Sequence, residues 1–138
     1  VLWNAGKALN DEKLKDKARV VMRHAAGRRA LHETSVYDAG LCHGSTGVAM
    51  IFHYMYRQTG DETLREARDF WHLRTLEHSC RPDGAAGYKF FFPTEDPSWR
   101  SDTSLLSGIA GVGLWILSML HEADDPQAFD WLPLFFLI

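Results

Sequence analysis

The feature that most restricts the fold is a glycine turn that occurs twice, each time at the start of an apolar helical stretch. Residues 41–48 (Leu-Cys-His-Gly-Ser-Thr-Gly-Val) align with residues 105–112 (Leu-Leu-Ser-Gly-Ile-Ala-Gly-Val) at an offset of 64. Each copy contains a Gly-x-x-Gly pattern, which lets the backbone approach a neighbouring helix closely. A second correspondence, at an offset of 50, relates residues 10–12 to residues 60–62. Repeated pairs of an inner apolar and an outer amphipathic helix predict an α/α arrangement, either a toroid or an open solenoid.

The periodicity of the apolar residues predicts an all-α chain. Asp11 and Asp61 are suited to cap two amphipathic helices, because a carboxylate at this position accepts hydrogen bonds from free backbone N–H groups. Gly27 and Gly60 are placed where helices end. The predicted helices are the second half of one at 1–9, followed by helices at 12–26, 45–58, 62–78 and 105–122.

The segments between these helices are less regular. Residues 28–39 are expected to form a loop with a short turn, and residues 80–103 form a long connection that carries three prolines. Within this connection, residues 88–92 (Tyr-Lys-Phe-Phe-Phe) are interpreted as either one short strand or an apolar loop packed on the core. Pro126 is expected to begin a final turn, and the apolar tail at 131–138 is expected to dock on the core.

Composition excludes several classes of function. The 138 residues are enough for one domain with a core, and a net charge of −3 argues against nucleic acid as a partner. The longest apolar run, 105–120, is interrupted by three glycines and two serines and is shorter than the ~20 residues that span a bilayer. The first residues do not resemble a signal peptide, so we expect a cytoplasmic protein. Two cysteines, Cys42 and Cys80, suit a reducing compartment, although a disulfide between them stays open.

The register of the repeats suggests that the chain is part of a larger protein. At the 50-residue offset, the position equivalent to Cys42 falls about eight places before Val1. The chain also begins without Met and without a helix start signal. We therefore expect residues 1–138 to be a single C-terminal segment of a helical repeat protein, with about two to three helix pairs.

Cys42 and His43 are the residues with the clearest chemical potential. Thiolate and imidazole are the commonest zinc ligands, and adjacent side chains can converge in an irregular glycine-rich turn. The pair predicts half of a metal site, with at least one ligand missing. Two other interpretations stay open at this point: a packed cysteine beside a hydrogen-bonded histidine, and the nucleophile and base of a hydrolase. Further candidate ligands, for which a packing or surface role is favoured, are Cys80, His53, His72 and His78.

Residues 41–47 (Leu-Cys-His-Gly-Ser-Thr-Gly) resemble the zinc-binding turn of the lanthionine synthetase C-like family, the lanthipeptide cyclases. Residues 105–114 are similar to the last repeat turn of that family, and Asp130-Trp131 with the following apolar tail resembles its C-terminal end. The resemblance covers essentially the whole chain. It implies an α/α toroid of two concentric helix layers, of which this chain would form about the last third.

The resemblance also implies a site and an activity. Cys42 and His43 would ligate Zn²⁺, and the third protein ligand would be a cysteine of the preceding repeat, before residue 1. The proton-transfer residues of the family lie in earlier repeats, so no catalytic residue is assigned here. Ser107 departs from the family pattern, in which an acidic residue is common. The implied reaction is addition of a peptide cysteine thiolate to dehydroalanine or dehydrobutyrine, which forms the lanthionine rings of lantibiotics.

An alternative function on the same fold is a non-catalytic scaffold that binds a thiol, a peptide or glutathione. A structural helical repeat without metal is a third interpretation. It is disfavoured because it gives the Cys-His pair no function. For the cyclase, the expected partners are a dehydrated precursor peptide and the dehydratase and transporter of the same pathway, through which the protein would associate with a membrane. Exposed apolar faces would favour self-association. Tyr37, Asp38 and residues 90–92 are either contacts for a peptide or, in the favoured interpretation, loop and core residues.

Overall fold

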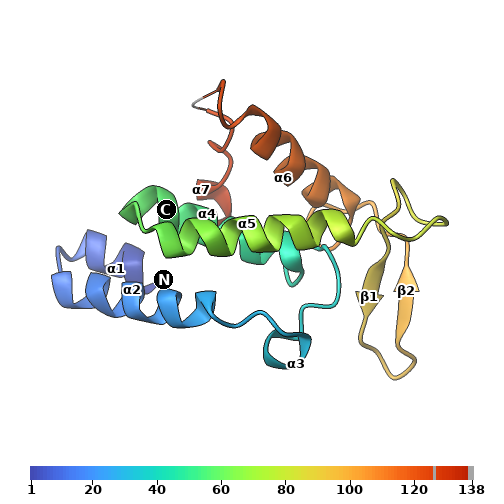
Figure 1. Cartoon of the computed structure of the whole chain (residues 1–138), viewed down its shortest axis with the longest axis horizontal. Coiled ribbons are helices and arrows are strands. Elements are labelled where there is room, and N and C mark those ends of the chain that lie inside the picture. Colours follow the sequence, from blue (N-terminus) through green and yellow to red (C-terminus); the bar gives the residue numbers. More distant parts are fainter. Residues whose placement is uncertain (126, 137–138) are drawn as a thin grey trace.

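The structure is a computed structural model that describes residues 1–125 and 127–136, and it is built mainly of helices (Figure 1). The predicted all-α fold class is therefore confirmed. In the described residues the elements are α1 (Leu2–Ala8), α2 (Glu12–Ala26), α3 (Leu31–Thr34), α4 (Ser45–Thr59), α5 (Glu62–Glu77), β1 (Phe90–Phe92), β2 (Ser98–Arg100), α6 (Ile109–His121) and α7 (Pro133–Phe136).

Two helix pairs share the same connection. Helix α1 pairs with α2, and α4 pairs with α5 (Figure 1). Asn10 and Gly60 end the first helix of each pair with positive φ values of 50° and 67°, the left-handed conformation typical of helix ends. The side chains of Asp11 and Asp61 then each accept a hydrogen bond from the backbone N–H two residues further along. The 50-residue correspondence is thus a structural repeat.

The two glycine turns are also built alike. The carbonyl oxygen of Asp38 accepts a hydrogen bond from Ser45 N at 2.8 Å, and that of Asp102 accepts one from Ile109 N at 2.9 Å. In each turn the closing N–H belongs to the first residue of the following helix, α4 or α6. The 64-residue offset therefore relates two copies of one backbone motif.

The last glycine of each turn is required by a close backbone contact. A Cβ atom on Gly47 would lie 2.0 Å from the carbonyl oxygen of Leu41, and one on Gly111 would lie 2.1 Å from that of Leu105. Both distances are far below van der Waals contact. Gly113, two residues after Gly111 on α6, has open space around the same position.

The main core lies where α4 meets α5, with α2 and α6 packed against them. Burial of each large apolar side chain there contributes about 1.5–3 kcal/mol. Three hydroxyls lie inside this contact: Thr75 Oγ1 is 2.9 Å from Ser45 Oγ and 3.4 Å from Thr46 Oγ1, and all three residues are fully buried. They join the start of α4 to α5. The core includes Leu41, Ala49, Phe52, Leu64, Ala67, Trp71 and Trp115.

The long connection after α5 contains an antiparallel hairpin (labelled β1 and β2 in Figure 1) in which β1 pairs with β2 and Phe91 lies opposite Trp99. The strand alternative for residues 88–92 is therefore correct for Phe90–Phe92, whereas β2 was not predicted. Phe90 is fully buried with Tyr88 and Val112 in a second apolar cluster, so its predicted core role is confirmed.

The start of α6 and the position of the C-terminal tail can be compared with the predictions from the sequence. Helix α6 begins at Ile109 rather than at residue 105, because residues 105–108 belong to the turn that Gly108 ends as N-cap. The predicted docking of the tail is confirmed for its described part, where Leu132 is buried and Phe135 packs on the main core. Pro126 and residues 137–138 lie outside the described residues.

None of the helices in the described residues is both long enough and apolar enough to cross a membrane.

Replacing Gly111 by Ala is expected to lower the free energy of unfolding by about 1–3 kcal/mol, because the new methyl group overlaps the Leu105 carbonyl oxygen. Gly113→Ala, on the same helix, is the matched control. It should raise the free energy of unfolding by about 0.5–1 kcal/mol, since the position is open and Ala favours helix. Urea unfolding of both variants measures the difference. Equal effects would show that the close contact does not restrict the turn.

Candidate metal centre

The turn before α4 presents Cys42 and His43 together on the surface. The backbone N–H of Cys42 donates to the carbonyl oxygen of Leu106 in the second glycine turn at 2.8 Å, which fixes this part of the loop. Leu41 points inward and is 2% exposed, whereas Cys42 and His43 are both exposed. The sequence thus places a thiol and an imidazole at the N-terminal end of an apolar helix.

The two side chains converge. Cys42 Sγ lies 2.8 Å from Nδ1 of His43, within hydrogen-bond distance. The other ring nitrogen, Nε2, lies 3.5 Å from Oδ2 of Asp38. Ser107 Oγ approaches Sγ at 4.0 Å from the second turn. The imidazole therefore has one nitrogen directed at the thiol and the other at a carboxylate.

Asp38 is the buried member of this group, with 1% of its surface exposed. Its Oδ1 accepts a hydrogen bond from Gly40 N at 2.8 Å, and its Oδ2 accepts one from Phe91 N at 2.7 Å. The favoured interpretation of Asp38 as a loop residue is thus confirmed, and its carboxylate makes a turn contact with Gly40 N. Its approach to His43 was not foreseen from the sequence. The available signal was Asp102, which lies 64 residues further along in the same place of the second turn.

A cavity of about 280 Å³ opens beside the pair. Cys42 and His43 contribute to its wall, and the rest of the lining is mostly apolar. Its apolar walls come from α4, from the second turn and from α7, and include Val48, Met50, Ile51, Leu106 and Phe135. The exposed thiol and imidazole therefore face a hollow that suits an apolar group next to a polar one.

Comparison with known proteins assigns the chain to a protein family. A family model described as "Lanthionine synthetase C-like protein" matches residues 1–134, nearly the whole length. The chain belongs to the lanthionine synthetase C-like family. A search of curated proteins finds no match.

The donor set of this lanthionine synthetase C-like chain fits part of a zinc site. Zinc in proteins is bound by cysteine thiolate and by a neutral imidazole nitrogen, and here both donors converge at an exposed position. In the described ranges 1–125 and 127–136, no group of three or more His, Cys, Asp or Glu residues is arranged to hold a metal ion. The residues present thus fit two ligands of a larger set.

The other candidate ligands are not brought to the pair to complete such a group. Cys42 and Cys80 are both free thiols, so the disulfide alternative does not form here. His72 accepts a hydrogen bond from the Trp115 indole at 3.1 Å, and burial lowers its pKa. Burial likewise lowers the pKa of His78, which lies at the end of α5.

His53 is a core histidine rather than a ligand. It is fully buried on α4 and its ring lies 4.0 Å from that of Phe129, centroid to centroid. Nδ1 is 3.4 Å from the Arg68 guanidinium, which in turn donates to both carboxylate oxygens of Glu122 at 3.1 Å. Burial, followed by the charges of Arg68 and Arg57, lowers the pKa of His53 from 6.5 to about 3. The imidazole is therefore neutral in the folded chain at neutral pH.

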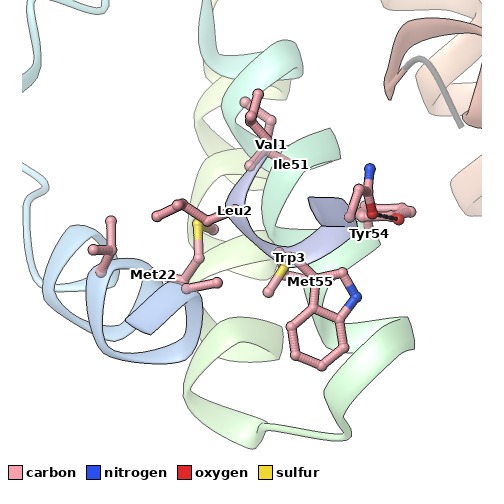
Figure 2. Close-up of a pocket in the computed structure, with 10 residues that line it drawn as sticks. Val1, Leu2, Trp3, Met22, Ile51, Tyr54 and Met55 are labelled. Carbon is pink, nitrogen blue, oxygen red and sulfur yellow. Dashed lines mark hydrogen bonds between the residues drawn. The ribbon is translucent and has the colours of Figure 1, made fainter. Parts of the chain in front are cut away.

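A second hollow is apolar and carries different chemistry. It has a volume of about 260 Å³ and lies between α1, α2 and α4. Figure 2 shows Trp3, Met22 and Ile51 among the side chains around it. The Tyr54 hydroxyl donates to Asn4 Oδ1 at 2.6 Å at its edge. This lining suits apolar packing. The candidate metal centre lies instead at the cavity of about 280 Å³ beside Cys42 and His43.

Acid should destabilise the fold through His53. The pKa is about 3 in the folded chain and about 6.5 in the unfolded chain, so the unfolded chain binds more protons between these values. The free energy of unfolding should therefore lose up to about 1.4 kcal/mol per pH unit as the pH falls from about 6.5 towards 3. Urea unfolding across this range should show a shallower slope for His53→Leu, whereas His24→Gln, at an exposed position, should keep the original slope. Equal slopes in all three proteins would contradict the assignment.

Proposed function

We propose that Cys42 and His43 are two protein ligands of a catalytic zinc ion, in an enzyme that closes thioether rings in a dehydrated peptide. Family membership supports a lanthionine synthetase type of function in general. The observation that supports the finer proposal is the convergence of Sγ and Nδ1 at 2.8 Å on the wall of a cavity. A purely structural pair would have no need of an exposed thiol at this place.

The reaction is an internal addition. The S–H of a peptide cysteine adds across the C=C bond of a dehydroalanine or dehydrobutyrine in the same peptide. One S–C bond forms at the β-carbon, the π bond breaks, and the α-carbon gains a proton, so the peptide mass does not change. Bound zinc would supply the positive charge that holds the attacking sulfur as a thiolate at neutral pH.

The chain's own residues would bind and orient the reactants. Cys42 and His43 provide soft and intermediate donors, the combination that zinc accepts. The apolar walls contributed by Val48, Ile51 and Phe135 would exclude water and receive the alkene side chain. Ser107, with its hydroxyl 4.0 Å from Sγ, places a neutral group where the family resemblance suggests an acidic one. The proton donor to the α-carbon is not assigned to any residue of this chain.

The test is metal content together with ring closure in a version of the protein that includes the preceding repeat. We expect about one zinc per protein by elemental analysis, with loss of zinc and of cyclisation in Cys42→Ala and His43→Ala. Removing a ligand costs most of the affinity because the site depends on the complete set. Since ring closure leaves the mass unchanged, it is followed by the loss of alkylatable thiol in the peptide.

Cys80→Ala is the matched control, because Cys80 is also an exposed free thiol but is not grouped with His43. It should retain zinc and activity. Zinc in Cys42→Ala at the wild-type level would contradict the ligand assignment. Zinc binding with capture of a peptide thiol but without ring closure would instead favour the non-catalytic scaffold.

A further inference from the structure

Asp38 is held on three sides. Its Oδ1 accepts the N–H of Gly40 within the turn, and its Oδ2 accepts the N–H of Phe91 from strand β1. The third neighbour is Nε2 of His43, 3.5 Å from the same Oδ2. A buried carboxylate with two backbone donors has a fixed orientation, because turning it would break both hydrogen bonds while the carboxylate stays buried.

Comparison with the second glycine turn distinguishes two roles of Asp38: one builds the turn, and the other is its contact with His43. Asp102 lies 64 residues after Asp38, and its Oδ1 accepts the N–H of Ser104 at 2.7 Å, the same bond that Asp38 makes to Gly40. The residue 64 places after His43 is Ser107, which has no ring. The aspartate therefore builds the turn in both copies, and in the first copy its other oxygen also faces an imidazole.

The two nitrogens of His43 have different surroundings as a result. An ionised carboxylate only accepts hydrogen bonds, so it favours the proton on the nitrogen that faces it, which is Nε2. Nδ1 then keeps its lone pair, on the side of Cys42 Sγ and the cavity. Only a nitrogen with a free lone pair can bind a metal ion, and a carboxylate behind the ring makes it more basic.

We propose that Asp38 is a positioning residue that holds the proton of His43 on Nε2 and so leaves Nδ1 free for the metal. The part of this proposal that concerns metal affinity rests on the proposed zinc site, whereas the part that concerns the proton does not.

The hairpin belongs to this arrangement. Phe91 N–H fixes the oxygen that faces the imidazole. The Phe91 ring contacts two other rings and lies 5.0 Å from that of Tyr37 and 5.5 Å from that of Trp99, centroid to centroid. Tyr37 directly precedes Asp38, so its tilted ring contact with Phe91 helps to hold the strand and the turn together. The hairpin thereby supports the position of His43 through the Asp38 oxygen that faces Nε2, whereas Cys42 faces Nδ1.

The first experiment needs no metal. In the metal-free 138-residue chain labelled with ¹⁵N-histidine, NMR at about pH 8 reports which ring nitrogen carries the proton. His43→Gln identifies the His43 signals among those of the seven histidines. We expect the proton on Nε2 in the wild type and a shift towards Nδ1 in Asp38→Asn, whose amide places a donor near Nε2. Asp102→Asn, which changes the equivalent turn carboxylate, should leave the His43 signals unchanged.

The second experiment measures zinc affinity by chelator competition, in the version of the protein that includes the preceding repeat. We expect Asp38→Asn to weaken binding by about 10–100-fold and Asp102→Asn by less than about twofold. Thermal unfolding of both variants accounts for general loss of structure, which would not move a proton between ring nitrogens.

The two experiments test separate parts of the proposal, so either part can be contradicted without the other. Unchanged His43 signals in Asp38→Asn would overturn the positioning role, whatever the zinc result. A shifted proton in a protein that binds no zinc would support the positioning role and contradict the proposed zinc site. Equal loss of zinc in Asp38→Asn and Asp102→Asn would overturn the specific role of Asp38 in metal affinity.

Discussion

The structure around the candidate site depends on backbone contacts so close that only glycine can make them. A Cβ on Gly47 would meet the Leu41 carbonyl oxygen at 2.0 Å, and one on Gly44 would meet Gly40 N at 2.2 Å. Because the backbone of the loop packs this closely on itself, the directions in which the side chains of residues 41–43 can point are restricted. Leu41 turns into the core, and Cys42 and His43 are directed out together. The convergence of the two donors is therefore a consequence of the glycines as much as of the donors themselves.

The second turn supports the first rather than repeating its chemistry. Leu106 supplies the carbonyl oxygen that accepts the Cys42 N–H, and a Cβ on Gly111 would lie 2.9 Å from the Leu41 Cβ. The second turn has no thiol or imidazole at the positions equivalent to Cys42 and His43, where Leu106 and Ser107 stand instead. One backbone motif thus serves twice, once to present donors and once to hold the presenting loop. Such division between copies is typical of repeat proteins, in which each unit is stabilised by its neighbours.

Features set by neighbouring residues were predicted well from the sequence. The limits of α2, Glu12–Ala26, agree with the prediction, because Asp11 caps its first turn and Gly27 follows its last. The start of α6 was placed four residues too early, because the apolar side chains of Leu105 and Leu106 fit a helix as well as a turn. Strand β2 was missed for a related reason: Ser98–Arg100 has no strand pattern of its own and becomes a strand by pairing with β1.

The same distinction applies to the site. Cys42 and His43 could be singled out because adjacency and flanking glycines are local properties, whereas the contact of Asp38 with Phe91 spans 53 residues. Burying the Asp38 carboxylate is costly unless its oxygens are hydrogen-bonded, and here backbone N–H groups of the turn and of β1 offset that cost without a metal. The orientation of His43 is for this reason a property of the folded chain itself. A side chain that is already oriented loses less conformational entropy when it binds a metal ion, so this long-range contact, which the sequence did not reveal, would favour the proposed metal binding.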